Sequence, residues 1–74
     1  MASIAQLQAR ELTSKLEEIY TELLKLNDKL WMLAVRESPD RITFVKAFRM
    51  TAIAVNAVAV AKSELEEVEG GDGR

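Results

Sequence analysis

The distribution of proline and glycine is the feature that most constrains the fold of this chain. The only proline is Pro39, and the first glycine is Gly70. Both residue types interrupt helices, so the two long stretches on either side of Pro39 can each be helical throughout. Ser3 is a favoured N-cap residue, and Gln6, three residues later, completes a capping box at the start of the first stretch.

The segment around Pro39 predicts where the chain reverses direction. The residue before a proline avoids helical geometry. Ser38 is therefore expected to cap a second helix that starts at Pro39, with Asp40 placed favourably for the helix dipole. We predict helices over about residues 4–36 and 39–69, joined by about two residues, and this short connection makes the helices antiparallel.

The predicted second helix has one ambiguous region and a clear end. Residues 52–61 alternate with period two around Asn56, as a pair of strands would. Alanine favours helix over strand and Asn-Ala is a poor hairpin turn, so we predict helix there. The glycines that follow stop the helix, which divides the chain into a helical hairpin domain, residues 1–69, and a flexible C-terminal tail, residues 70–74.

Apolar residues recur in both predicted helices at alternating steps of three and four, the period of a helix that packs along one neighbour. The first stripe is Leu12, Leu16, Ile19, Leu23, Leu26, Leu30 and Leu33. The second stripe is Phe44, Ala47, Thr51, Ala54, Val58, Ala61, Leu65 and Val68. We predict that these stripes form the core. Counting outward from the turn places Trp31 opposite Phe44, and the same count places Asn27 opposite Phe48.

The small size of the chain predicts association. A chain of 74 residues buries little surface on folding. It has no cysteine for a disulfide and no histidine for the usual zinc or copper sites. We therefore predict an all-α protein in which an antiparallel two-helix hairpin dimerises into a four-helix bundle. The residues predicted for the dimer interface are Tyr20, Leu24, Ile53, Asn56 and Val60.

The charge pattern predicts the direction of the two hairpins in that dimer. Residues 25–49, at the loop end, carry six basic and three acidic side chains, a net +3. Residues 1–24 carry two basic and four acidic side chains, and residues 50–74 carry two basic and five acidic ones, so these segments have net charges of −2 and −3. Reversed hairpins place opposite charges together, and we predict an antiparallel homodimer.

The residue types that most enzymes need are scarce. Without histidine or cysteine the chain cannot build a nucleophilic triad, and it has no glycine-rich phosphate-binding motif. We predict no enzyme activity, no cofactor and no metal. One enzyme hypothesis stays open, in which Arg36, Lys46 and Arg49 bind an anionic substrate and act by electrostatic stabilisation.

The sequence favours a structural or interaction role. We predict a homodimeric helical-hairpin adaptor or small regulator that docks another macromolecule, with an unidentified protein as partner. The alternative is a nucleic-acid-binding regulator, because basic residues cluster toward the loop end. These residues are Lys25, Lys29, Arg36, Arg41, Lys46 and Arg49.

The expected location of the protein is the cytoplasm. The absence of cysteine fits a reducing compartment, and the first residues lack the basic and apolar regions of a signal peptide. The most apolar run, residues 51–61, is shorter than the roughly 20 residues that span a bilayer. Lys46 and Arg49 interrupt any longer window, so we predict no membrane-spanning segment.

Overall fold

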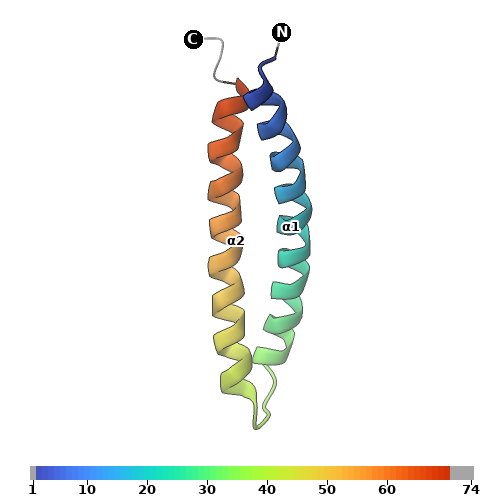
Figure 1. The fold of residues 1–74 in the computed structure, drawn as a ribbon. Coiled ribbons are helices and arrows are strands. Elements are labelled where there is room, and N and C mark those ends of the chain that lie inside the picture. Colours follow the sequence, from blue (N-terminus) through green and yellow to red (C-terminus); the bar gives the residue numbers. More distant parts are fainter. Residues whose placement is uncertain (1, 71–74) are drawn as a thin grey trace.

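The chain folds into two long helices that lie side by side (Figure 1). In the computed structural model, which describes residues 2–70, α1 spans Ile4–Ala34 and α2 spans Arg41–Gly70. The helices run antiparallel, so the start of α1 and the end of α2 share one end of the molecule, and the loop forms the other (Figure 1). The predicted all-α hairpin is confirmed.

The region that was ambiguous in sequence is helical. Residues 52–61 lie in the middle of α2, and residues 2–70 contain no strand. The high helix propensity of alanine accounts for this result. The helix includes Gly70, one residue more than predicted, whereas residues 71–74 of the predicted tail lie outside the described residues.

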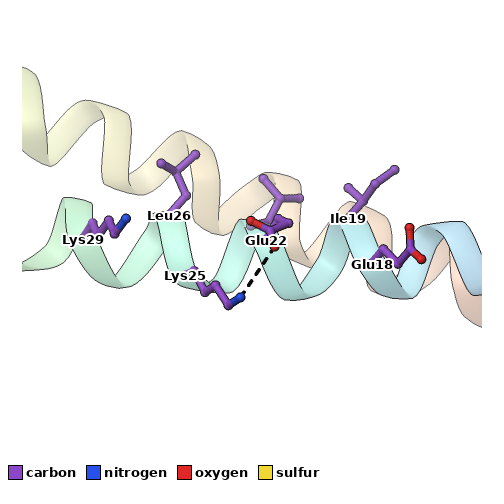
Figure 2. Close-up of a pocket in the computed structure, with 7 residues that line it drawn as sticks. Glu18, Ile19, Glu22, Lys25, Leu26 and Lys29 are labelled. Atoms are coloured by element: carbon purple, nitrogen blue, oxygen red, sulfur yellow. Dashed lines mark ion pairs between the residues drawn. The ribbon is translucent and has the colours of Figure 1, made fainter.

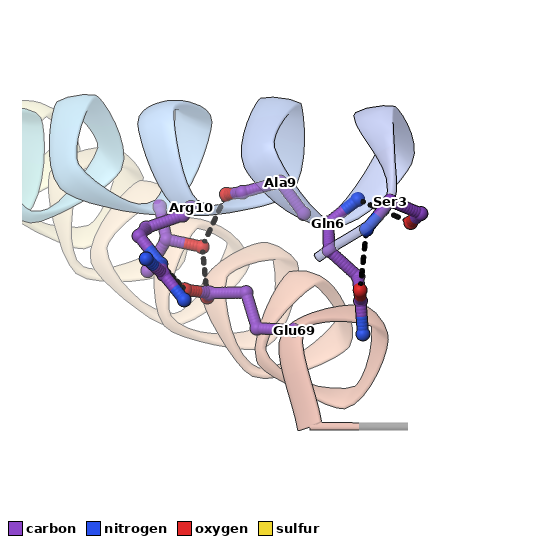
Figure 3. Close-up of polar contacts among 6 residues, drawn as sticks. Ser3, Gln6, Ala9, Arg10 and Glu69 are labelled. Atoms are coloured by element: carbon purple, nitrogen blue, oxygen red, sulfur yellow. Dashed lines mark hydrogen bonds and ion pairs between the residues drawn. The ribbon is translucent and has the colours of Figure 1, made fainter. Parts of the chain in front are cut away.

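The start of α1 is fixed by the predicted capping box, which Figure 3 shows. The Gln6 backbone N–H donates to Ser3 Oγ at 3.1 Å, and the Ser3 backbone N–H donates to Gln6 Oε1 at 2.8 Å. Each side chain therefore satisfies a backbone donor that the first turn leaves free. The prediction of this cap from two sequence positions is confirmed.

The loop is longer than predicted. It comprises residues 35–40, because α1 ends at Ala34 and α2 begins at Arg41. The Arg41 N–H donates to Ser38 O at 3.2 Å, so Ser38 opens a tight turn through Pro39 instead of capping a helix that starts there. The expectation of a connection of about two residues was wrong, because this turn and the turn at the end of α1, where the Arg36 N–H donates to Leu33 O at 3.3 Å, take up the extra length.

The face of α1 that meets α2 differs by half from the predicted stripe. Its least exposed residues alternate in steps of three and four, and we call them, with their counterparts on α2, the contact seam. On α1 they are Gln6, Ala9, Thr13, Leu16, Tyr20, Leu23, Asn27, Leu30 and Ala34. From the predicted stripe, Leu16, Leu23 and Leu30 belong to this set and Leu33 is half-buried beside it, whereas Leu12, Ile19 and Leu26 are exposed.

The seam of α2 differs from its predicted stripe in the same way. Its members all have less exposed side chains, and they are Phe44, Phe48, Thr51, Val55, Val58, Lys62, Leu65 and Glu69. Every second member of the predicted stripe is shared, namely Phe44, Thr51, Val58 and Leu65; of the others, Ala47 and Ala54 are half-buried beside the seam, and Ala61 and Val68 are exposed. In both helices, the seam therefore replaces every second residue of the predicted stripe by the next residue along the chain, which lies roughly 100° further around the helix.

Packing between the two helices is thin. Among residues 2–70 no large side chain is fully buried, and the buried apolar residues are Ala9 and Ala34. Gln6 and Thr13 are the buried polar ones. Two helices alone offer no third element to cover the outer flank of each seam, so the larger side chains stay partly in water.

Candidate interaction surfaces

One flank of the contact seam carries ion pairs that join the helices. Glu17 Oε1 lies 2.9 Å from Lys62 Nζ, and Arg10 Nε lies 3.8 Å from Glu69 Oε1. On α1 these positions recur every seven residues, so they follow one edge of the seam. We call this flank the paired side, and its α1 residues are Arg10, Glu17, Leu24 and Trp31.

The ion pair at mid-length changes the titration of its lysine. The side-chain hydrogen bond to Glu17 raises the pKa of Lys62 above its ordinary value of 10.5, partial burial opposes the rise, and the Glu17 and Glu66 carboxylates add to it. The lysine is therefore held in its charged form by a partner on the other helix.

Glu69 also reaches the seam near the open end of the hairpin (Figure 3). The Thr13 hydroxyl oxygen lies 2.9 Å from Glu69 Oε2 and 2.8 Å from Ala9 O. A hydroxyl has a single proton, so Thr13 donates to one of these two acceptors at a time. This contact and the Arg10 pair together anchor the end of α2 to the first turns of α1.

Asn27 fixes the alignment of the helices along their length. Its Nδ2 donates to Thr51 Oγ1 at 2.7 Å and to Phe48 O at 3.2 Å. The Thr51 hydroxyl in turn donates to Phe48 O at 2.9 Å. The predicted contact of Asn27 with Phe48 is confirmed, but the same count was wrong for Trp31, which packs beside Phe48 and not Phe44. A slip of one turn would leave the partly buried Asn27 amide without partners.

The opposite flank of the seam is apolar. Trp31 of α1 and Val45 of α2 lie together on the paired side. The residues that border the seam on its other edge, from both helices, therefore lie together on the opposite side of the hairpin. We call this flank the apolar side. Its residues are Leu12, Ile19, Leu26 and Leu33 on α1, and Ala47, Ala54, Ala61 and Val68 on α2. No ion pair crosses between the helices on this side within residues 2–70.

Three large residues of the apolar side, Leu12, Ile19 and Leu26, remain exposed, whereas Leu33 is half-buried. Leu12 is 50% exposed, and Ile19 and Leu26 are each 48% exposed. They stand seven residues apart, and Figure 2 shows Ile19 and Leu26 extending from the same edge of α1 while Lys25 extends from the other edge. A single hairpin therefore presents a continuous line of half-exposed aliphatic side chains to water.

A shallow groove of about 510 Å³ runs along α1 beside this line (Figure 2). Ile19, Leu23 and Leu26 form its apolar floor. Its charged rim is Glu18, Glu22, Lys25 and Lys29. Within the rim, Lys25 Nζ lies 3.6 Å from Glu22 Oε1.

A second groove lies on the paired side next to the loop. The Trp31 and Phe48 rings form its aromatic part, with centroids 5.3 Å apart and planes inclined at 46°. Arg41 and Arg49 also line it, and Arg41 Nε donates to Ala34 O at 3.3 Å. We call it the loop-end groove; Trp31 is 53% exposed there.

The five residues predicted for a dimer interface fall on different surfaces. Tyr20 is half-buried in the contact seam, and Leu24 is exposed on the paired side. Ile53, Asn56 and Val60 are exposed on the outer face of α2, away from α1. Sequence reasoning assigned Leu12, Ile19 and Leu26 to the core of the single hairpin, although their spacing of seven residues was visible in the sequence.

The six basic residues predicted to contact nucleic acid are also divided. Lys25 and Lys29 lie on the groove of α1, whereas Arg41 and Arg49 line the loop-end groove. Arg36 is exposed in the loop, and Lys46 is exposed on the outer face of α2. The three cations of the enzyme hypothesis, Arg36, Lys46 and Arg49, are all exposed, so they do not form an inward-facing anion pocket.

Acidic residues do not gather into a metal-binding group in the part of the chain that the structure describes. Residues 2–70 contain no cluster of three or more histidine, cysteine, aspartate or glutamate side chains that could hold an ion.

The length and hydropathy of α2 do not support the expectation that the chain has no segment able to span a membrane. An 18-residue window within Arg41–Gly70 has a mean hydropathy of 1.5 and none of it is buried, so α2 is long and apolar enough to cross a membrane by length and composition. The core helix of a soluble protein has a similar composition, but such a helix is mostly buried, whereas no residue of α2 is buried.

Comparisons with known proteins add no family to this description. No family model matches the chain, and no significant match was found among curated proteins or among solved structures.

Proposed function

We propose that this protein is a non-enzymatic homodimeric adaptor or small regulator, in which two hairpins associate into a four-helix bundle that docks another macromolecule. The observation that carries the proposal is the exposed apolar side of a hairpin that fully buries no large side chain among residues 2–70. Covering that side with a second hairpin removes aliphatic surface from water and supplies the missing layer of the core.

The surface area of the chain supports association. The chain exposes 5826 Å², whereas a compact monomer of its mass, 8.3 kDa, exposes about 4,600 Å². The difference between these two areas exceeds the roughly 800 Å² that each partner buries in a standard protein interface. The elongated hairpin, with extents of 57 × 17 × 12 Å, distributes this surface along its length, where a second hairpin can cover it.

The proposal is tested by the concentration dependence of unfolding. For a folded dimer, the urea midpoint rises with protein concentration, because unfolding separates the two chains. We expect a clear rise between about 1 and 100 μM, measured by circular dichroism, and no aggregation at the higher concentration. A midpoint that does not change over this range, with the mass of a single chain, contradicts the dimer.

The docking surface that we favour is the loop-end groove. It combines Trp31, Arg41 and Arg49, and tryptophan and arginine are the residue types most enriched at binding hot spots. The groove lies on the paired side, so a second hairpin on the apolar side leaves it accessible. Its two arginines and its aromatic floor fit an acidic protein segment with an apolar anchor.

The second candidate function is nucleic-acid binding, and the same groove favours it. Arginines neutralise phosphates, and an exposed tryptophan can stack on an unpaired base. A retained single-stranded RNA whose binding weakens steeply with salt supports this alternative. The variants Trp31→Ala and Arg49→Ala would then weaken binding, whereas Lys25→Ala, on the other groove, is the control. Retention that is absent at about 50 mM salt removes the alternative.

A further inference from the structure

The geometry points to a second copy of this chain, seated in the reversed direction, as the occupant of the apolar side. This inference rests on the proposed dimer and adds its face and its direction. It places the interface on Leu12, Ile19 and Leu26 instead of on the outer face of α2. Three kinds of observation carry it: the spacing of the large residues, the charges beside them and the distribution of small residues.

The spacing of the large residues makes the apolar side self-complementary. Leu12, Ile19 and Leu26 are equally spaced, and Ile19 lies near the middle of α1. When two α1 helices cross in opposite directions at this level, Ile19 meets its own counterpart. Leu12 then meets the partner's Leu26, and both hairpins overlap over almost their whole length. A two-fold interface requires this kind of match of a surface with itself.

The charges beside the line of aliphatic residues match in the same arrangement. Lys15 and Glu22 lie on the outer edge of the line, one helical step beyond Leu12, Ile19 and Leu26. Because they are placed almost symmetrically about Ile19, Lys15 faces the partner's Glu22, and Glu22 faces the partner's Lys15. Among residues 2–70 Lys15 forms no ion pair within its own chain, whereas Glu22 lies 3.6 Å from Lys25 Nζ, so in the dimer its carboxylate is shared between Lys25 and the partner's Lys15.

The net charges of the two ends favour the same direction. The loop-end segment, residues 25–49, carries a net +3, and the two segments at the open end carry −2 and −3. Reversed hairpins bring each positive end against a negative one. Hairpins that point the same way would bring the two positive ends together and the two negative ends together, which is unfavourable at low ionic strength.

Small residues on α2 allow the second contact of the reversed dimer, which is between the two α2 helices. At the level of Ile19 and Leu26, α2 presents Ala61 and Ala54 on the apolar side. In the reversed dimer the two α2 helices are neighbours, and alanine lets their backbones approach closely. The bundle is therefore wide where α1 meets α1 and narrow where α2 meets α2.

Thiol crosslinking tests the face and the direction together. The chain has no cysteine, so each substitution introduces a single thiol. With a short bis-thiol crosslinker, we expect Ile19→Cys to form covalent dimers. Leu12→Cys and Leu26→Cys should not crosslink alone, because like positions lie about 20 Å apart, but the two variants unfolded and refolded together should crosslink.

The outcomes of this experiment separate the possible assemblies. Crosslinking of Leu12→Cys with Val68→Cys, but not with Leu26→Cys, would show hairpins pointing the same way and overturn the direction, because each α1 then lies beside the partner's α2. Crosslinking by Ile53→Cys but not by Ile19→Cys would move the interface to the outer face of α2 and overturn the face. A wild-type chain with the mass of a monomer would instead overturn the dimer itself, and with it the proposed function.

Charge reversal tests the direction without a thiol. We expect Lys15→Glu and Glu22→Lys each to raise the dimer dissociation constant roughly tenfold at low salt, because two copies of each pair become repulsive. The double variant should restore most of the affinity. Restoration by Lys15→Glu with Glu64→Lys, but not with Glu22→Lys, would overturn the reversed arrangement, because Lys15 is level with Glu64 when hairpins point the same way.

Discussion

The two sides of the hairpin differ in how far one chain completes them. On the paired side, Glu17 meets Lys62, and Arg10 meets Glu69, so charges from one helix find partners on the other. On the apolar side, Ile19 and Leu26 are each 48% exposed, so the single hairpin covers them only in part. The comparison shows that hydrophobicity alone does not identify the seam within a chain, because the more hydrophobic side is the one left open.

The largest expected effect comes from placing a charge on the apolar side. Ile19→Glu would bury two carboxylates near the centre of the proposed dimer, at a cost of at least about 3 kcal/mol per dimer. The dissociation constant should then rise more than about 100-fold, measured by sedimentation or light scattering. Leu24→Glu is the matched control, because Leu24 is 42% exposed on the paired side. If Leu24→Glu separates the chains and Ile19→Glu does not, the assignment of the two sides is reversed.

A smaller loss of stability is expected at the seam between the two sides. Asn27→Ala removes the hydrogen bonds to Thr51 Oγ1 and Phe48 O and should lower the free energy of unfolding by about 1–2 kcal/mol. Asn56→Ala is the control, because Asn56 is exposed on α2 and alanine favours helix there. Equal stability of the two variants, in urea unfolding at one protein concentration, would show that the Asn27 bonds do not hold the helices in register.

The cap at the start of α1 lies on neither side of the hairpin, so its loss measures the stability of a single helix end. Ser3→Ala removes the oxygen that accepts the Gln6 N–H, and the free energy of unfolding should fall by about 1 kcal/mol. Ser63→Ala, in the exposed interior of α2, should not destabilise the protein. If Ser63→Ala lowers the free energy of unfolding as much as Ser3→Ala does, the Ser3 cap does not stabilise the helix specifically.

The smallest effect concerns the ion pair of the paired side. Because the pKa of Lys62 is raised in the folded protein, the pair stabilises the fold fully below the ordinary lysine pKa of 10.5, and this contribution is lost as pH rises through the folded value. The midpoint of thermal unfolding should therefore fall more steeply above about pH 10 in the wild type than in Glu17→Gln. Parallel curves for the two proteins would show that the pair does not contribute.

Much of the fold could be predicted from a few positions in the sequence. Ser3 and Gln6 specified the cap, and Pro39 marked the reversal between two helices, because these residues act through local backbone chemistry. The length of the loop could not be predicted, since Ser38 opens a turn in the structure and the same residue types also suit a direct helix start.

The candidate surfaces were harder to predict, because they depend on which flank of each helix faces the other. The stripe of leucines in α1 included both Leu16, in the seam, and Ile19, outside it. The seam instead takes in Thr13 and Asn27, whose polar atoms find partners on α2, and a hydrophobic period does not register such residues. The loop-end groove depends on Trp31 packing beside Phe48, one turn away from the predicted Phe44.

The solution mass decides whether the apolar side of one chain is covered by another chain. Light scattering over a dilution series should give twice 8.3 kDa, and this mass should persist into the low micromolar range. A helical, cooperatively folded species of 8.3 kDa at every concentration would contradict the account, because the exposed line of Leu12, Ile19 and Leu26 would then be stable in water without a partner.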